Sequence, residues 1–177
     1  MQMRRRIVIP VAVVSVILGA CATTDTATTP NADPHILAIA IVANQGEVDQ
    51  GNAATPRATN PDVRAFAEMM VRDHTTGVNE LRNVGTQDAI TPTDNDITAA
   101  LQRTTRETIT NLGTYSGAEF DRQYMQTQVN VHQWYLTALE QHLIPGARNA
   151  QLRTLLERQR GIVAQHLEQA RAIRGRL

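Results

Sequence analysis

Apolar residues recur every three or four positions along the chain from residue 35 onward, and no stretch shows convincing strand-like alternation. This spacing gathers the apolar side chains on one face of a helix, so the pattern predicts an all-α domain. Interruptions divide the region into four long helices and one shorter helix. The predicted helices cover residues 35–55, 61–85, 94–112, 116–144 and 148–174.

Residues typical of helix ends support these boundaries. Asn60, Pro61 and Asp62 combine an N-cap residue, a proline at the first helical position and an acidic first turn. Ser116 and Glu119 have the spacing of a capping box. Pro145 and Gly146 are expected to close the helix that Ser116 opens.

The lengths of the links predict how the helices are arranged. Short links join the first two long helices and the last two, which makes each pair antiparallel. The long link between the pairs contains the 94–112 helix. The sequence therefore predicts a ferritin-like four-helix bundle with up-down-down-up topology and a short extra helix in the crossover.

Several polar residues fall inside the apolar helix faces. A polar group buried without a partner costs about 1–3 kcal/mol, so these groups are expected to bond one another or a ligand. The candidate metal ligands are Glu47, His74, Asp121, His132 and His166. The residues expected to support them in the polar core are Asn44, Asp73, Gln128 and Gln159.

Two interpretations of this polar set remain open. Buried side chains can form structural hydrogen-bonded pairs, or some of them can bind a transition metal such as Fe, Mn, Zn or Cu. The Glu-x-x-His motif of di-iron bundles does not occur in the sequence. Its absence argues against a metal-dependent oxidase or peroxidase, and the protein is expected to have no enzymatic activity.

Helix geometry gives an expectation for how these residues meet. If the short links set the register, Glu47 and His166 share one level, and His74 and His132 lie at another, roughly 10 Å lower. The same rise per residue places Asp121 about 16 Å from His132. Two separate layers of paired side chains are therefore expected in preference to one four-ligand site.

The N-terminal segment has the features of an export signal. Arg4–Arg6 precede an apolar run over residues 7–18, which is shorter than the about 20 residues of a membrane-spanning helix. Cys21, the chain's single cysteine, follows Ala20 at the position of a lipoprotein cleavage box. The alternative is an ordinary signal peptidase cut that leaves a soluble periplasmic protein.

The predicted organisation is a lipoprotein signal peptide over residues 1–20, a tether over 21–34 that begins at lipidated Cys21, and a helical domain over 35–175. Ala22, in place of an aspartate that retains lipoproteins in the inner membrane, favours the outer membrane with the domain facing the periplasm.

Charge excludes one class of partner. Removal of the three signal-peptide arginines leaves 14 basic and 17 acidic residues, a net charge of −3. Nucleic-acid binding needs a concentration of basic residues, so no nucleic-acid partner is expected.

Several segments resemble a known family. They are residues 43–48, 60–74, 117–124, 128–132 and 164–170, with the Asp73-His74 and Phe120-Asp121 pairs as the most specific parts. Together they resemble the bacterial domain of unknown function 4142 family of exported ferritin-like proteins. The resemblance implies a ferritin-like fold and an envelope location, singles out the five candidate ligands above, and supplies no activity.

The sequence thus favours a non-catalytic envelope lipoprotein with a stress-related or partner-binding role, anchored to the membrane by lipid and acting on a protein partner or small ligand not yet identified. The alternative is a ferritin-like protein that stores, buffers or senses a transition metal.

Overall fold

Residues 32–177 are described by the computed structural model, and the predicted signal peptide, Cys21 and most of the tether lie outside them. The elements in chain order are α1 (Asp33–Ala54), α2 (Pro61–Gln87), α3 (Asp96–Leu112), α4 (Gly117–Ala138), a π-helical turn (Leu139–Leu143), α5 (Ile144–Gly146) and α6 (Ala150–Arg174). Residues 32–177 contain no strand, which confirms the prediction of an all-helical domain.

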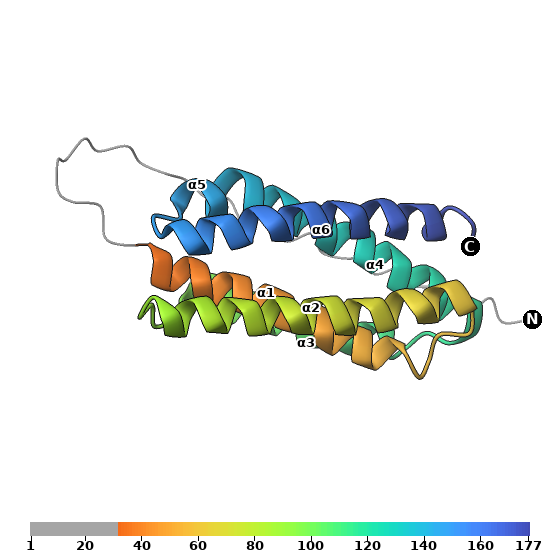
Figure 1. Cartoon of the computed structure of the whole chain (residues 1–177). Coiled ribbons are helices and arrows are strands. Elements are labelled where there is room, and N and C mark those ends of the chain that lie inside the picture. Colours follow the sequence, from red (N-terminus) through yellow and green to blue (C-terminus); the bar gives the residue numbers. More distant parts are fainter. Residues whose placement is uncertain (1–31) are drawn as a thin grey trace, which may run out of the picture. The chain divides into compact units, whose positions relative to one another are not determined.

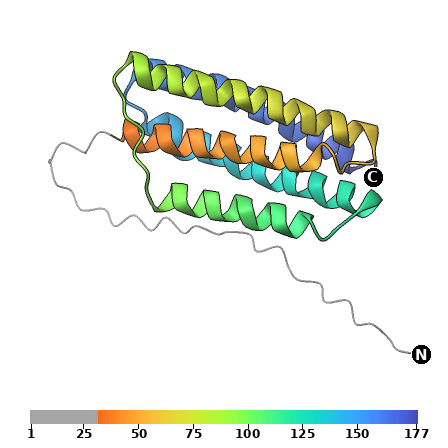
Figure 2. The same ribbon diagram turned by 90° about the horizontal axis from the view of Figure 1, so that it is seen from below.

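The helices pack as two antiparallel pairs, α1 with α2 and α4 with α6 (Figure 1). α1, α3 and α6 run in one direction, and α2 and α4 run in the other (Figures 1 and 2). α3 packs along α1, and it connects the end of the first pair to the start of the second pair (Figure 2).

Asparagine side chains begin three of the helices. Asn60 accepts hydrogen bonds from the backbone N–H groups of Asp62 and Val63, as the sequence predicted. Asn149 caps α6 through the N–H of Leu152. Asn95 forms a capping box with Thr98 at the start of α3.

The capping box predicted at Ser116 is wrong, because this side chain makes no capping hydrogen bond. The next residue, Gly117, has φ 57°, a left-handed conformation that differs from the right-handed backbone of an ordinary first helical turn. Glu119, the other expected member of the box, bonds Arg122 and Gln123 on its own helix.

Pro145 does not end the helix that begins at Gly117. Proline cannot donate a hydrogen bond to the preceding turn, and its ring crowds the backbone there. The chain widens into the π-helical turn, in which the N–H of Ile144 bonds the carbonyl of Leu139. Helical backbone continues to Gly146, so the turn into α6 falls at residues 147–149, later than the sequence predicted.

The interior consists of two apolar clusters with a polar layer between them. The first includes Leu37, Ala40, Leu81, Leu139 and Leu156. The second includes Phe66, Met70, Phe120, Met125 and Ala170. On each of the four long helices, buried polar positions fall between the two clusters in sequence; they are Asn44, Glu47 and Gln50 on α1, His74 on α2, Gln128 and His132 on α4, and His166 on α6. Three other buried polar residues of these helices lie elsewhere: Asp33 at the start of α1, Asp121 within the second cluster on α4, and Gln159 within the first cluster on α6.

In the part of the chain that the structure describes, no helix has the length and apolar character needed to cross a membrane.

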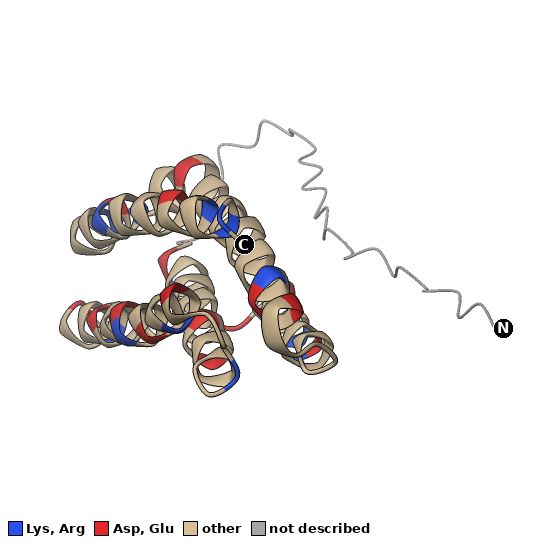
Figure 3. Cartoon of the chain, turned by 90° about the vertical axis from the view of Figure 1, so that its right-hand side faces the viewer, with Lys and Arg blue, Asp and Glu red and all other residues tan. Residues whose placement is uncertain are grey.

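Seen end-on, acidic and basic residues both occur along the helices (Figure 3).

Candidate metal centre

Three histidines from three helices meet in the polar layer. His74 on α2, His132 on α4 and His166 on α6 have ring centroids 5.3–5.6 Å apart. One ring nitrogen from each residue lies within 4.8 Å of the others. The three side chains are at most 4 % exposed. This is an arrangement in which one metal ion can be held between three imidazoles.

Helical spacing directs each histidine inward. His74 follows Phe66 and Met70 at intervals of eight and four residues, which places all three on one face of α2. His132 lies one turn beyond Gln128 on α4. The Phe66 and His132 rings pack edge to face, with their centroids 6.3 Å apart.

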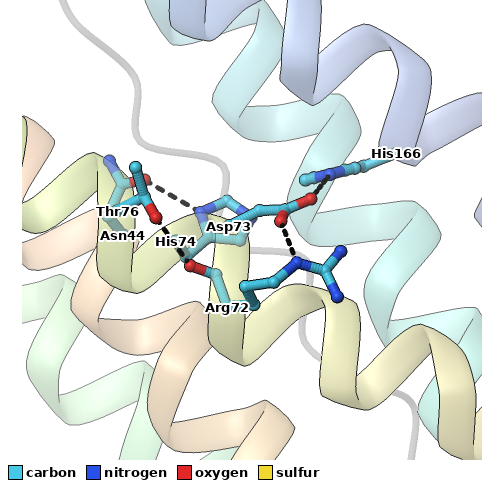
Figure 4. A network of polar contacts seen from close by, with 6 residues as sticks. All are labelled: Asn44, Arg72, Asp73, His74, Thr76 and His166. Carbon is cyan, nitrogen blue, oxygen red and sulfur yellow. Dashed lines mark hydrogen bonds and ion pairs between the residues drawn. The ribbon is translucent and has the colours of Figure 1, made fainter.

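Each imidazole has one nitrogen engaged in a hydrogen bond. Nδ1 of His74 contacts Oδ1 of Asn44 at 2.9 Å, and Nε2 of His166 contacts Oδ2 of Asp73 at 3.2 Å (Figure 4). Nδ1 of His132 contacts the backbone oxygen of Gln128 at 2.9 Å. All three partner atoms are acceptor oxygens, so each of these nitrogens carries the proton and donates.

The second nitrogen of each ring has no hydrogen-bond partner among the described residues. These atoms are Nε2 of His74, Nε2 of His132 and Nδ1 of His166. Since the opposite nitrogen carries the proton, each of these atoms has a free lone pair in the neutral ring. Metal-binding histidines characteristically fix their tautomer in this way, with an oxygen acceptor on the nitrogen that does not bind metal.

Burial keeps the histidines neutral. It lowers the pKa of His132 to about 3, and the neighbouring His166 contributes to the shift. Burial also lowers the pKa of His74 well below its usual value, with His132 and His166 adding to the effect. For His166 burial again lowers the pKa, while Asp73 opposes the shift. Protons therefore do not compete for the lone pairs at neutral pH.

A hydrogen-bond network fixes the orientation of Asn44. Its Nδ2 contacts the carbonyl of Ala40 at 2.8 Å, the hydroxyl of Tyr135 at 3.0 Å and Oε1 of Gln159 at 3.2 Å. This leaves Oδ1 directed at His74. A Cβ at Gly77 would lie 2.7 Å from that oxygen, so the position requires glycine.

Glu47 lies in the same polar layer but is not one of the three clustered residues. Its Oε2 has no partner among the described residues, and neither does the hydroxyl of Tyr124. Burial raises the pKa of Glu47 to about 8, partly offset by a hydrogen bond with the side chain of Gln128. The carboxyl is therefore largely protonated at pH 7.

Asp121 does not join the histidines. Its two oxygens accept the backbone N–H of Thr59, the hydroxyl of Thr59 and the backbone N–H of Asn60. These bonds hold the loop between α1 and α2, so the carboxylate serves the loop and is fully engaged there.

The expected separation of His166 from His74 and His132 is wrong. A turn centred on Pro145 and Gly146, as the sequence predicted, would place Met125 opposite His166. The turn instead follows the π-helical segment, which moves the register of α6 against α4 by about two helical turns and places His132 beside His166.

The expected supporting residues Asn44, Asp73, Gln128 and Gln159 all lie around the cluster or its network. Sequence reasoning missed Tyr124, Tyr135 and Gln50. Tyr135 follows His132 by three residues and Tyr124 precedes Gln128 by four, so helical spacing from the polar residues already recognised would have found both.

Comparison with solved structures finds a similar fold. The crystal structure of a DUF305 fragment from Deinococcus radiodurans has a TM-score of 0.72 and 14% sequence identity, with 84% of this chain and 98% of that chain covered. A comparison with curated proteins finds no match. The family described as "Domain of unknown function (DUF4142)" matches residues 19–173. The match confirms the resemblance inferred from the sequence, and the chain belongs to the DUF4142 family.

Proposed function

We propose that this protein binds one transition-metal ion through His74, His132 and His166. Two observations carry the proposal. Three buried histidines bring one ring nitrogen each to within 4.8 Å of the others, and each ring has one nitrogen held by an oxygen and one without a partner among the described residues. An unfilled polar site of this kind is costly without a ligand, and a metal ion satisfies all three nitrogens at once.

The donor set indicates the class of metal. Neutral imidazole suits Zn, Cu, Fe and Ni, whereas Mn prefers carboxylate and water oxygens. Since Glu47 and Asp121 lie outside the cluster, Cu and Zn fit best among the Fe, Mn, Zn and Cu considered from the sequence. Three protein ligands leave room for a fourth, exchangeable ligand, which suits buffering, storage or sensing of the metal.

A structural role is the second candidate, and the Asn44 network favours it. Asn44, Tyr135 and Gln159 bond one another across three helices, with no need for a ligand. In this case the protein is a non-catalytic bundle that acts through a protein partner or small ligand, and the histidines pack without metal.

The arrangement of the helices supports a ferritin-like four-helix bundle, which we propose as the fold. The two antiparallel pairs and the parallel course of α2 and α4 support this assignment, with α3 as the extra helix of the crossover.

We also propose that Cys21 is lipidated and anchors the domain to the outer membrane, facing the periplasm. The basic, apolar and small-residue segments before Cys21 support this location. A Cys21→Ser variant is expected to lose the lipid mass and to leave the membrane fraction. Retention of the variant in that fraction would remove the anchor proposal.

The test of metal binding uses full-length Cys21→Ser protein, so that the thiol does not contribute. We expect one Zn or Cu ion per chain after equilibration and gel filtration, measured by elemental analysis. His74→Ala, His132→Ala and His166→Ala should each lose the ion. His142→Ala, which removes an exposed histidine outside the cluster, is the matched control and should retain it. If the three cluster variants kept the same number of metal ions per chain, the metal-binding proposal would be rejected and the structural role would stand.

A further inference from the structure

A pocket of about 210 Å³ lies between α2 and α6, beside the three-histidine cluster. His74 and Asn44 form part of its buried wall, and exposed Thr76, Arg158 and Ile162 form part of its outer wall. The pocket therefore extends from the surface to a residue of the candidate metal centre.

Asp73 connects the pocket with the cluster. It lines the pocket, its side chain is 29% exposed, and its Oδ2 contacts Nε2 of His166 (Figure 4). Its other oxygen, Oδ1, forms an ion pair with Arg72 at 2.9 Å. The Arg72 side chain is 67% exposed, so this ion pair lies at the protein surface. A carboxylate in this position can meet a hydrated cation from solvent while it touches a histidine of the cluster.

The second acidic residue of the pocket makes no contact with the cluster. Glu80 on α2 bonds Arg158 on α6 at 2.7 Å, which links the two helices across the pocket. Both acidic residues pair with an arginine, but only Asp73 also contacts a histidine of the cluster.

Approach to the cluster along the bundle axis is less favourable for an ion. The apolar clusters on either side of the polar layer contain Leu81, Leu139 and Leu156 in one direction and Phe66, Met70 and Met125 in the other. Passage of a cation through apolar packing strips its hydration without replacement. The pocket is open to solvent, and although most of its wall is apolar, Asn44, Asp73 and Thr76 supply amide, carboxylate and hydroxyl groups there.

We infer that the pocket between α2 and α6 is the entrance through which a transition-metal cation reaches the three histidines, and that Asp73 is the first protein ligand it meets. The inference rests on the proposed metal-binding function and adds the route to it. Asp73 acts here as a capture and positioning residue, and the histidines hold the ion.

The test compares the rates of metal uptake and release with the equilibrium affinity. In Ile162→Trp a large ring occupies the mouth of the pocket. Gln169→Trp is the matched control, because residue 169 is an exposed position two turns further along the same face of α6 and does not line the pocket. Full-length Cys21→Ser protein carries each substitution, and stopped-flow mixing with Zn²⁺ or with chelator gives the two rates.

We expect Ile162→Trp to slow both association and release about tenfold or more, with the dissociation constant unchanged, because an obstructed path affects both directions equally. Gln169→Trp should leave both rates unchanged. Thr76→Trp, which obstructs the pocket from α2, should reproduce the slowing and decides the matter if Ile162→Trp does not fold.

Asp73→Asn should slow association and weaken its dependence on ionic strength, because a negative charge at the entrance attracts the cation. Uptake at the unsubstituted rate in both tryptophan variants would overturn the entrance while leaving the metal site intact. Absence of bound metal at equilibrium in the unsubstituted protein would instead refute the proposed function, and the entrance with it.

Discussion

Asp121 and His132 lie on the same helix and are both 1% exposed, yet their surroundings differ completely. Asp121 is at one end of the bundle and accepts three hydrogen bonds from the loop between α1 and α2. His132 is in the middle and has a ring nitrogen without a partner among the described residues.

The other end of the bundle repeats the first pattern. Asp33, 3% exposed, accepts the backbone N–H groups of Arg148 and Asn149 in the turn before α6. At both ends, a buried carboxylate ties a loop to a helix. The central layer differs, because its buried groups include Glu47 and three histidines with unsatisfied atoms. The comparison suggests that the ends serve stability and the middle serves a ligand.

The largest effect is expected at the end of the bundle. Asp121→Ala removes an acceptor shared by three donors and leaves two backbone N–H groups of the loop without it. We expect the free energy of unfolding to fall by about 3 kcal/mol. Chemical denaturation with and without Zn²⁺ measures this, and folded Asp121→Ala should still bind metal. Loss of metal by the folded variant would contradict the division between the ends and the middle.

Acid should destabilise the metal-free protein through its middle layer. The histidines have pKa values below 6.5 in the folded state, so the unfolded chain takes up more protons as the pH falls below 6.5. Glu47 opposes this, because its pKa is raised to about 8 and its contribution to stability grows as the pH falls from 8 toward 4.5. We expect maximal stability near pH 6.5 and a net loss of about 2 kcal/mol by pH 5.

The Glu47→Gln variant separates the two contributions. Its stability should no longer rise as the pH falls from 8 to 6.5, and its loss below pH 6.5 should be steeper. Urea denaturation at half-unit pH intervals provides the measurement. A pH profile for Glu47→Gln that matched the unsubstituted protein would show that this carboxyl is ionised or solvated in the folded state.

Apolar periodicity and the residues typical of helix ends predicted much of the fold and the buried polar set. The helix starts at residues 33, 61, 96, 117 and 150 lie within two residues of those expected, because apolar spacing and flanking turn residues are local signals. The same spacing identified His74, His132 and His166 as buried. The common level of His74 and His132 was predicted, but the joining of His166 was not, because it depends on the register between α4 and α6, which the π-helical turn before Pro145 changes.

A smaller effect is expected from the N-cap residues at the end of the bundle where Asp121 bonds the loop. Asn60 caps α2 with its side chain and donates its backbone N–H to Asp121. Asn60→Ala should cost about 1 kcal/mol in the free energy of unfolding. Ser116→Ala should have no measurable effect, because Ser116 makes no capping bond. Equal losses in the two variants, measured by thermal unfolding, would show that Ser116 caps α4 in solution.

The smallest change in stability is expected from His132→Leu in the metal-free protein. The substitution removes the unpartnered nitrogen and replaces the ring with an apolar side chain of similar size. The lost hydrogen bond was to the carbonyl of Gln128, which lies one turn earlier in the same helix and can still accept the backbone N–H of residue 132. We expect the free energy of unfolding to change by less than about 1 kcal/mol and in the stabilising direction, while Zn²⁺ binding is abolished.

Comparison with Asp121→Ala makes this result decisive. Urea denaturation of both metal-free variants gives their free energies of unfolding, and a Zn²⁺ titration of each gives their metal affinities. A buried residue whose substitution leaves stability unchanged but abolishes metal binding functions in ligand binding. A buried residue whose substitution lowers stability but leaves metal binding unchanged functions in the fold. If His132→Leu were destabilised as much as Asp121→Ala, the histidines would be part of the structural network, and the middle of the bundle would not differ in purpose from its ends.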